Sequence, residues 1–326
     1  MTLKIGFVGT GGISQGHQNC LSKIEGVTVS AFTSNTQMSS DKAAQAHTHA
    51  KSYGSLTDML DDQKLDAVYI CVPPHVHEGL EEQLIERSIP FLVEKPLGIN
   101  QELPLAIAKR LKETNLLNSV GYHWRYLDSA QRAKQLIADS DVKVGMALGY
   151  WMGTMPMADW WINYDTSGGQ FVEQTTHIVD MLRLLCGEVS EVYAAFSQRV
   201  MHEQVPGTSV FDVGTVTMKL ASGAVATISN SCLLPTYHKV GLDIYTNKGI
   251  IELQESCLKV TEADRVDEYK CSGDPLFREN EAFIHALRTG DRSLILSDYQ
   301  DSLKTHKITL AANLSVKTGK PVQIEA

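Results

Sequence analysis

A glutamate, a lysine and a proline follow directly on a short apolar run near residue 91. The stretch reads FLVEKPLGIN from Phe91, so that Glu94 and Lys95 stand at the end of a predicted strand. Burial and neighbouring charges decide whether a lysine in such a place is charged or neutral. In either form it could take or give the hydroxyl proton of an alcohol–ketone redox step, and Glu94 could anchor or tune it. The structural alternative is a surface charge pair that precedes a helix.

A second group of residues suited to proton transfer lies in the segment SGGQFVEQTTHIVD. We expect one helix over Gly169–Cys186, which a glycine then ends. Glu173, His177 and Asp180 are spaced at i, i+4 and i+7, so they would share one face of this helix. A carboxylate one turn before a histidine can orient it and raise its pKa. The structural alternative is a solvated polar face.

Three glycines follow the first predicted strand, Leu3–Val8. In the stretch GFVGTGGIS they are Gly9, Gly11 and Gly12. A dinucleotide-binding turn needs such glycines, because the backbone turns tightly and the first amides of the next helix face a pyrophosphate. Ser14 stands at the third glycine position and is small enough to let helix and strand approach. Because the turn opens a strand–helix alternation, we favour dinucleotide binding over a purely structural turn.

The end of the second predicted strand, Val27–Thr33, bears on the choice between NAD and NADP. A carboxylate at this place would bond the ribose 2′-hydroxyl of NAD and repel a 2′-phosphate. This chain has Ser34 and Asn35 instead, and Lys42 could reach back to a phosphate. The sequence therefore favours NADP, with ordinary turn residues and NAD as the alternative.

Two prolines and two histidines follow the apolar run Ala67–Val72. Pro73 and Pro74 would shape the floor of a cofactor crevice at the carboxyl edge of a parallel sheet. His75 and His77 could suggest a metal pair, but a zinc site needs three or four ligands. We therefore expect no metal ion there.

Strand and helix signals alternate through the first third of the chain. This alternation predicts parallel βαβ units and a doubly wound Rossmann sheet of the α/β class. The predicted strands are Leu3–Val8, Val27–Thr33, Ala67–Val72, Phe91–Val93 and Leu117–Tyr122. Both the glycine turn and Lys95 should then lie at the carboxyl edge of the sheet.

The pattern changes after about residue 125. A long helix is followed by strands with short turns, which predicts a large, mainly antiparallel open sheet with a helix on one side. The predicted strands are Val189–Val200, Val210–Leu220, Ala224–Cys232, Val240–Thr246 and Ile250–Leu253, and the closing helices are Phe277–Arg288 and Asp298–Lys317. We expect a Rossmann domain over residues 1–122 and an α+β domain over residues 123–326.

Composition narrows the class of partner. The net charge of −9 argues against nucleic acid or an anionic membrane, since both bind basic surfaces. No apolar run reaches the ~18 residues that a membrane span needs, and the N-terminus shows no secretory leader. The six cysteines form no CxxC pair, which is typical of reduced thiols in a cytoplasmic protein.

Taken together, the motifs resemble the glucose–fructose oxidoreductase, inositol dehydrogenase and MocA (Gfo/Idh/MocA) family. The resemblance is carried by GFVGTGGIS near the start, EKP at 94–96, GYHWRY at 121–126 and GGQFVEQTTHIVD at 168–180, and it covers nearly the whole chain. It implies a Rossmann domain followed by an α+β domain whose open sheet often forms the oligomer interface. It also implies an NAD(P)-dependent oxidoreductase that acts on sugars, cyclitols or related polyols.

Carried over by motif position, the resemblance implies that Lys95 is the catalytic lysine and His177 the proton-transferring histidine. Glu173 stands where the family has an aspartate four residues before that histidine, so it keeps the charge but adds a methylene. Thr175 replaces the family's glycine two residues before the histidine. Both departures suggest a subgroup with its own substrate orientation.

Aromatic residues gather in the sequence where a sugar could bind, with core packing as the alternative. Rigid aromatic rings pack well on the C–H surfaces of sugars. We expect substrate contacts from Lys95, Tyr122, Trp161, Glu173 and His177. We expect cofactor contacts from Gly9, Thr10, Gly11, Gly12, Ile13, Ser34, Asn35, Cys71, Val72, Pro73, Pro74, His77, Glu94, Lys95 and Arg125. For Arg125 a structural salt bridge is the alternative.

The main hypothesis is a hydride-transferring sugar or polyol dehydrogenase in which Lys95 and His177 handle the proton. One alternative keeps the nucleotide tightly bound and uses transient oxidation for elimination or glycoside cleavage. Another is a non-catalytic regulator that senses a dinucleotide. An open antiparallel sheet needs covering, so we expect a homodimer or homotetramer.

Overall fold

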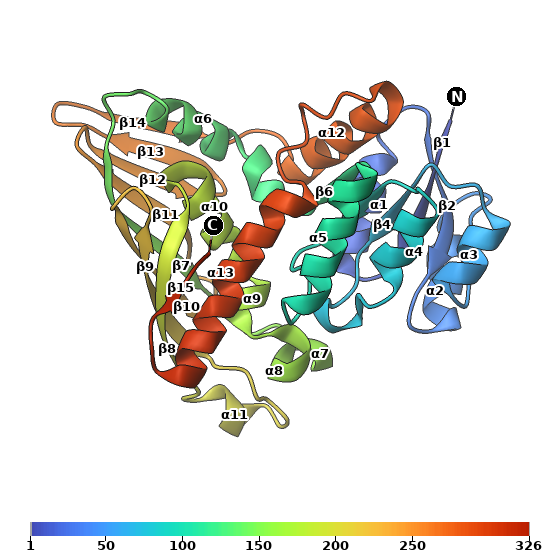
Figure 1. The fold of residues 1–326 in the computed structure, drawn as a ribbon, viewed down its shortest axis with the longest axis horizontal. Coiled ribbons are helices and arrows are strands. Elements are labelled where there is room, and N and C mark those ends of the chain that lie inside the picture. The colour runs from blue at the N-terminus through green and yellow to red at the C-terminus, as the bar shows by residue number, and fades with distance from the viewer. Residues whose placement is uncertain (1, 326) are drawn as a thin grey trace. The chain divides into compact units, whose positions relative to one another are not determined.

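The computed structural model describes residues 2–325, which divide into two compact units with separate sheets (Figure 1). The first unit runs to Gly98 and also takes in Glu102–His123 and Asp274–Leu303. The second unit comprises Ile99–Gln101, Trp124–Gly273 and the chain from Lys304 onwards. The contacts therefore place residues 274–303, which the sequence-based division assigned to the second domain, with the first unit.

A six-stranded parallel sheet forms the middle of the first unit. Its strand order, β3-β2-β1-β4-β5-β6, is that of a Rossmann sheet. The strands are β1 (Leu3–Val8), β2 (Val27–Thr33), β3 (Lys51–Tyr53), β4 (Ala67–Ile70), β5 (Phe91–Val93) and β6 (Asn118–Val120). All residues of β4 and β5 are buried, because helices cover both faces of a doubly wound sheet. The predicted fold class of this part is confirmed.

The edge strand β3 and the helix after it were not predicted. β3 has three residues, begins with Lys51 and Ser52, and pairs with β2 alone. So short and polar a segment carries no apolar run that a sequence pattern could reveal. Helix α3 (Leu56–Asp62) follows, and the side chain of Ser55 caps it by accepting a hydrogen bond from Asp58 N.

Helices surround the first sheet, and one of them comes from far along the chain. They are α1 (Gly12–Leu21), α2 (Gln37–Gln45), α3, the short 3₁₀ helix η1 (Pro74–Val76), α4 (Leu80–Glu86), α5 (Glu102–Thr114) and α12 (Pro275–Thr289). Helix α12 packs against α1. Its Phe283 lies edge-on to Tyr69 of β4, with ring centroids 5.6 Å apart, and Tyr69 in turn stacks on Phe7 of β1. These buried rings make α12 part of the first core.

A nine-stranded sheet forms the second unit, in the order β14-β13-β12-β11-β7-β10-β9-β8-β15. Its neighbouring strands are antiparallel except for the β7–β10 pair, so the predicted mainly antiparallel sheet is confirmed. The strands are β7 (Val144–Met152), β8 (Val189–Ser197), β9 (Val213–Leu220), β10 (Val225–Ser231), β11 (Lys239–Thr246), β12 (Ile250–Gln254), β13 (Cys257–Thr261), β14 (Val266–Lys270) and β15 (Val322–Gln323). Strands β7, β13, β14 and β15 were not predicted.

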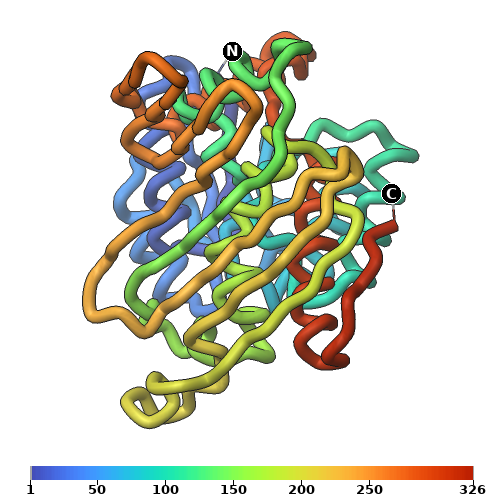
Figure 2. Tube along the Cα trace, turned by 90° about the vertical axis from the view of Figure 1, so that its left-hand side faces the viewer, coloured from blue at the N-terminus to red at the C-terminus, as the bar shows by residue number. Residues whose placement is uncertain are grey.

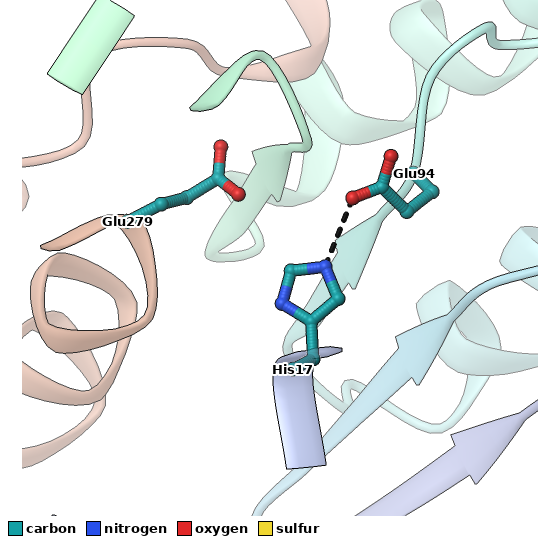
Figure 3. A group of neighbouring side chains, drawn as sticks. All are labelled: His17, Glu94 and Glu279. Atoms are coloured by element: carbon teal, nitrogen blue, oxygen red, sulfur yellow. Dashed lines mark hydrogen bonds and ion pairs between the residues drawn. The ribbon is translucent and has the colours of Figure 1, made fainter. Parts of the chain in front are cut away.

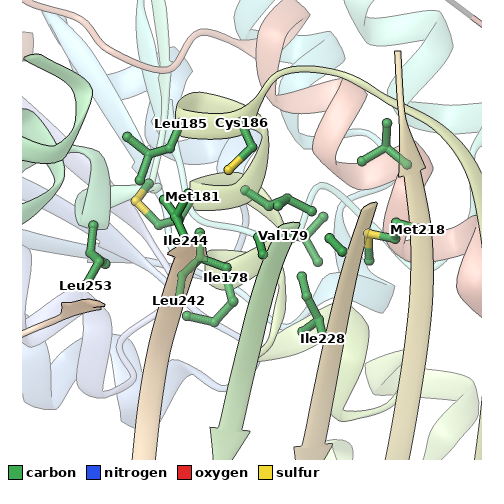
Figure 4. Packing of buried hydrophobic residues seen from close by; sticks show 14 of the residues in the cluster. Ile178, Val179, Met181, Leu185, Cys186, Met218, Ile228, Leu242, Ile244 and Leu253 are labelled. Atoms are coloured by element: carbon green, nitrogen blue, oxygen red, sulfur yellow. The ribbon is translucent and has the colours of Figure 1, made fainter. Parts of the chain in front are cut away.

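Helix α10 (Thr176–Cys186) packs on the inner face of this sheet. Figure 4 shows its apolar side chains, among them Ile178 and Met181, against side chains of the central strands such as Leu242. The helix approaches β7 closely because Gly149 has no side chain: a Cβ there would lie 2.7 Å from Cγ2 of Ile178. All α10 residues except Leu184 are buried, so this helix is anchored along its whole length.

The single helix expected over Gly169–Cys186 is interrupted, and that prediction was wrong in this respect. Short α9 (Gln170–Glu173) ends at Gln174, and α10 begins at Thr176. Between them the amide of Thr175 donates to Gln170 O over 3.0 Å, a wider turn than that of an α-helix. The break puts Glu173 on a different helix from His177. The alternative of a solvated polar face is also wrong, since His177 and Asp180 are buried.

The remaining helices are η2 (His123–Tyr126), α6 (Asp128–Ile137), α7 (Asp159–Ile162), α8 (Tyr164–Ser167), α11 (Met201–Gln204) and α13 (Tyr299–Thr318). Figure 2 looks onto the outer face of the large sheet, where its strands run side by side. Exposed and buried residues alternate along β9, and Tyr193 of β8 is 47% exposed. Within residues 2–325 no helix combines the length and the apolar character of a membrane span.

Candidate active site

The carboxyl edge of the first sheet brings four sequence motifs together. The residue after each of four strands is bonded to a neighbouring strand: Gly9 N donates to Thr33 O, Cys71 N to Val8 O, Glu94 N to Ile70 O and Gly121 N to Val93 O, over 2.8–2.9 Å. Strands β1, β4, β5 and β6 are adjacent in the sheet. The glycine turn, the proline segment, Glu94-Lys95 and Gly121-Tyr122 therefore lie side by side, at the edge where doubly wound sheets bind ligands.

The glycine turn has the geometry of a dinucleotide-binding turn. Gly9 has φ of +93°, and a Cβ on it would lie 2.1 Å from the carbonyl oxygen of Cys71, so a side chain does not fit there. A Cβ on Gly11 or Gly12 would meet no atom within 4 Å, which leaves open space beside the start of α1. No side chain caps that helix, so its first amides remain for a ligand. The turn thus fits a pyrophosphate.

The end of β2 offers hydroxyl and amide groups. Thr10 Oγ1 and Ser34 Oγ lie 3.2 Å apart, and Ser34 Oγ donates to Asn35 Oδ1 over 3.3 Å. The next carboxylate along the chain, Asp41, accepts hydrogen bonds from Gln37 and from a serine of β3. These donors and acceptors are compatible with either a ribose hydroxyl or a phosphate.

The segment after β4 separates its two histidines. His75 is exposed, whereas the side chain of His77 is 1% exposed. Nδ1 of His77 lies 2.7 Å from Oε1 of Glu81, one turn along in α4, and Glu81 is likewise buried. Pro74 is also buried. The two histidines therefore point to different environments, and the cofactor contact expected of His77 stays a prediction.

Glu94 is held firmly at the end of β5. Its side chain is 4% exposed, and Oε1 lies 2.9 Å from Nε2 of His17, on α1. Gly121 leaves room for it, because a Cβ there would lie 2.4 Å from Oε1 of Glu94. Burial raises the pKa of Glu94, but the hydrogen bond and charge of His17 and the charge of Lys95 outweigh burial and hold this pKa below its ordinary value.

Lys95 and His123 share this environment. The Lys95 side chain is half-buried, and the Lys95–Pro96 peptide bond is cis. Burial lowers the pKa of His123 to about 4, although the charge of Glu94 opposes this shift. Lys95 lowers the pKa of His123 further. A neutral imidazole therefore lies close to the carboxylate and the amine of the EKP motif.

A third acid faces Glu94 and His17. Figure 3 shows the carboxyl group of Glu279, on α12, pointing toward the other two side chains. One ligand atom from each of the three lies within 4.8 Å of the others, close enough for a metal ion to bridge them. Both ring nitrogens of His17 are already engaged, however, Nε2 with Glu94 and Nδ1 with Asn280. The hydrogen bonds thus favour a proton network over a cation site.

In the second unit, the imidazole of His177 lies among tryptophan rings. Its centroid is 6.1 Å from that of Trp124 and 6.0 Å from that of Trp151, with interplanar angles of 21° and 20°. The side chain is 4% exposed. These large rings exclude water from most of the imidazole and restrict the orientation of its plane.

Asp180, three residues after His177 on α10, anchors a buried polar network. Arg125 donates to both its oxygens, from Nε over 2.7 Å and from Nη2 over 2.6 Å. Thr305 Oγ1 also donates to Asp180, and Arg183 Nη1 donates to Thr305 Oγ1. Arg125 therefore makes the salt bridge that the sequence analysis left as its structural alternative. A cofactor contact of Arg125 stays a prediction.

The residues expected to contact substrate lie in different places. Nε1 of Trp161 donates to Oε2 of Glu173 over 2.6 Å, so the indole orients this carboxylate. Trp161 itself is 1% exposed, and so is Tyr122, which packs in the core of the first unit. Lys95 belongs to the first unit and His177 to the second. Their meeting at one substrate stays a prediction.

Sequence reasoning missed three residues around the EKP motif: His17, His123 and Glu279. His17 lies eight residues after Gly9 on the buried side of α1, and His123 sits inside the GYHWRY motif, so both had a signal in their spacing. Glu279 had none, because it lies among the charged residues of a helix that the sequence analysis placed in the second domain.

Sequence models of protein families match both parts of the chain. The oxidoreductase family with an NAD-binding Rossmann fold matches residues 3–122, and the GFO/IDH/MocA C-terminal domain matches residues 130–252. Together these matches cover more than half of the chain.

Relatives match over most of its length. A myo-inositol 2-dehydrogenase of Thermotoga maritima is 21% identical over 99% of either chain. A D-xylose 1-dehydrogenase (NADP⁺) of Haloferax volcanii is 25% identical over 84% of this chain and 85% of its own. Among solved structures, a levoglucosan dehydrogenase in complex with NADH and L-sorbose has a TM-score of 0.87 at 19% identity, over 100% of both chains.

Proposed function

The chain belongs to the Gfo/Idh/MocA oxidoreductase family, and on that premise we propose that it transfers a hydride between a nicotinamide dinucleotide and a hydroxyl-bearing carbon of a sugar, cyclitol or related polyol. The observation that carries the proposal is the carboxyl edge of the first sheet. There an open glycine turn and the Glu94-Lys95 pair follow strands β1 and β5, with β4 between them.

The glycine turn and its neighbours would hold the cofactor. Gly9, Gly11, Gly12 and the first amides of α1 would bind the pyrophosphate, because the turn is open at the positions where a Cβ would otherwise project. The segment from Cys71 to Pro74 would form the floor beside it. A bound nicotinamide ring would supply the hydride acceptor or donor.

Lys95 and His177 would handle the proton. When the substrate is oxidised, its carbon gives up a hydride and its hydroxyl gives up a proton, which leaves a carbonyl group. The amine of Lys95 would take that proton and the carboxylate of Glu94 would balance the charge that appears on the amine. His177, packed against Trp124 and Trp151, would hold the hydroxyl in line or pass the proton on.

We further propose that the cofactor is NADP. The groups at the end of β2 are Ser34 and Asn35, and neither would repel a 2′-phosphate. The xylose dehydrogenase relative uses NADP⁺ by name, which supports this choice, whereas the structural relative in complex with NADH supports NAD. Measurement of kcat/KM with NADP and with NAD will decide between the two cofactors.

Names of relatives also guide the choice of substrates. The inositol and xylose dehydrogenases act on ring compounds that carry several hydroxyl groups. We therefore propose that a cyclic polyol or sugar fits the aromatic and acidic residues around Glu173 and Trp161. The panel should contain inositols, pentoses, hexoses and anhydrosugars.

The experiment that tests this function follows the absorbance of the reduced nicotinamide with NAD and NADP across that panel. We expect turnover on at least one cyclic polyol or sugar. Lys95→Ala should remove it, while Lys109→Ala, an exposed lysine of α5, should keep it. Full activity of Lys95→Ala on a good substrate would exclude the role of Lys95, and dinucleotide binding without any turnover would favour a sensor.

We also propose that the outer face of the large sheet is covered by another copy of the chain. Tyr193, Val225 and Met146 are exposed on strands β8, β10 and β7, and an open face of this kind is stabilised when it is covered. Sedimentation equilibrium should show a dimer or tetramer, and Tyr193→Lys should shift it toward the monomer. A monomeric wild-type protein at micromolar concentration would contradict this.

A further inference from the structure

Glu279 is a buried acid that the proposed reaction does not use. It lies on α12 with 0% of its side chain exposed. Neither carboxyl oxygen has a hydrogen-bond partner among residues 2–325. Its carboxyl group faces Glu94 and His17, within 4.8 Å of a ligand atom of each (Figure 3). An ionised carboxylate in such a place would be strongly destabilised, so the site must hold a proton or a cation.

The two acids respond to their surroundings in opposite directions. Burial and then the charge of Glu94 raise the pKa of Glu279 well above its ordinary value. The pKa of Glu94 lies below its ordinary value, because the His17 hydrogen bond and nearby positive charge outweigh its burial. When the pKa values of two neighbouring acids are shifted in opposite directions, one acid keeps the proton and the other stays ionised. The pair therefore carries a single proton, on Glu279.

Of the carboxyl oxygens of Glu94 and Glu279, His17 is hydrogen-bonded to Oε1 of Glu94. The amide nitrogen of Asn280 donates to Leu276 O over 2.7 Å and lies 2.9 Å from Nδ1 of His17. Oδ1 of Asn280 lies 3.2 Å from the same Nδ1, and Nε2 of His17 lies 2.9 Å from Oε1 of Glu94. Helix α12 thus supplies both Asn280, which holds Nδ1 of His17, and Glu279, which faces Glu94.

We propose that Glu279 is a positioning residue held as a neutral acid, which leaves Glu94 as the one ionised carboxylate behind Lys95. The catalytic part of this inference rests on the proposed function. A second negative charge at Glu279 would favour the protonated amine of Lys95 and slow the removal of the substrate's hydroxyl proton. The neutral acid fills the space opposite Glu94 without adding that charge. Residues 274–303 thereby take part in setting up the EKP motif.

Other titratable groups surround the pair and belong to any account of its pH dependence. Cys20, Tyr69 and Cys71 contact Glu279 electrostatically from α1, β4 and the segment after β4. Lys95 and His123 act on Glu94. Burial raises the pKa of both thiols and of the phenol, so these three groups stay neutral at neutral pH.

The first test reads the proton directly and does not require activity. The infrared spectrum of the wild-type protein at neutral pH should contain the C=O stretch of a protonated carboxyl group. Glu279→Gln should remove this band, and Glu281→Gln, an exposed acid of the same helix, should keep it. Absence of the band in the wild type, or its survival in Glu279→Gln, would overturn the proposal. So would a divalent cation bound in equal amount to the purified protein and lost in Glu279→Gln.

Stability against pH gives a second reading of the same proton. A carboxyl group whose pKa is raised in the folded state makes the protein less stable as pH rises. In the unfolded chain the same group ionises at a lower pH. The melting temperature of Glu279→Gln minus that of the wild type should therefore increase from pH 5 to pH 8. The matched difference for Glu281→Gln should stay flat. A flat difference for Glu279→Gln as well would contradict the neutral acid.

The catalytic part is tested by comparing an alanine with a glutamine. Glu279→Ala should lower kcat about tenfold with KM for substrate and cofactor little changed, since Glu279 would act through Glu94 and touch neither. Glu279→Gln, which imitates the protonated acid, should restore most of kcat and the wild-type pH profile. If alanine and glutamine are equally impaired, Glu279 is not a positioning residue of this kind. A wild-type protein that is inactive on every sugar would instead refute the proposed function, and the infrared test would still decide the proton.

Discussion

Arg125 donates two hydrogen bonds to Asp180, from Nε over 2.7 Å and from Nη2 over 2.6 Å, one to each carboxylate oxygen. Both side chains are buried, at 5% and 0% exposure, and Asp180 lies three residues after His177 on α10. Their bond ties the start of the second unit to the helix that carries the proposed proton-transferring histidine. The pair thus fixes the orientation of α10, while the rings of Trp124 and Trp151 pack against the imidazole.

Removal of one partner of this pair should be costly. Asp180→Asn leaves Arg125 buried without its counter-charge, and we expect the free energy of unfolding to fall by about 3–5 kcal/mol. Urea unfolding measures the change. The exposed pair of Lys51 and Asp62 serves as control, and Lys51→Ala should cost no more than about 1 kcal/mol. Equal effects of the two substitutions would contradict a structural role for the buried pair.

Gly9 and Gly11 should respond differently to the same substitution. Gly9→Ala puts a Cβ 2.1 Å from the backbone of Cys71 at positive φ, so we expect lower stability as well as lost dinucleotide binding. Gly11→Ala meets no atom of the protein and should fold normally, but its methyl group would occupy the space for the pyrophosphate. Thermal melting and calorimetric titration with NADP separate the two. Wild-type affinity in Gly11→Ala would place the pyrophosphate elsewhere.

The buried imidazole of His123 should make the protein sensitive to acid. Its pKa in the folded chain is about 4, below the ordinary 6.5, so the unfolded chain takes up a proton first as pH falls. This group's contribution is fully present above pH 6.5 and declines by up to about 1.4 kcal/mol per pH unit toward pH 4. Relative to His123→Gln, the wild type should therefore lose stability over this window. Parallel pH profiles for the two proteins would show that His123 does not titrate as described.

A carboxylate at the end of β2 should change the preference for cofactor. Ser34→Asp places a negative charge beside Thr10, where the 2′-phosphate of NADP would lie. We expect the ratio of kcat/KM for NADP to that for NAD to fall about tenfold, which corresponds to about 1.4 kcal/mol. Ser34→Asn is the uncharged control and should leave the ratio close to wild type. An unchanged ratio in Ser34→Asp would put the adenosine ribose at another place.

Much of the first unit could be predicted because its signals are local. Apolar runs such as Ala67–Ile70 are buried on both faces, and the glycines of the first turn are required by backbone geometry at fixed spacing. Because the predicted strands are parallel, the end of the strand that precedes Lys95 had to lie at the carboxyl edge of the sheet. Edge strand β3 escaped because a three-residue strand is held by its neighbour's hydrogen bonds and needs no apolar residues of its own.

The parts that could not be predicted depend on contacts between distant segments. Helix α12 reads as an ordinary amphipathic helix, and its contacts with the first unit, such as those of Phe283 and Asn280, show where it belongs. The interruption between α9 and α10 contains no glycine or proline that would have predicted it. Asp180 reads as a surface acid because its partners, Arg125 and Thr305, lie 55 and 125 residues away. Burial of a polar residue depends on such partners, and a local pattern contains none of them.

The account rests on Lys95 and His177 acting on one hydroxyl group, and a crystal structure with cofactor and a bound sugar tests this most directly. We predict that Nζ of Lys95 and a ring nitrogen of His177 each lie about 3 Å from the substrate oxygen that is oxidised, with the adjacent carbon facing the nicotinamide. A sugar bound in a cleft that holds only one of these two side chains would contradict the account.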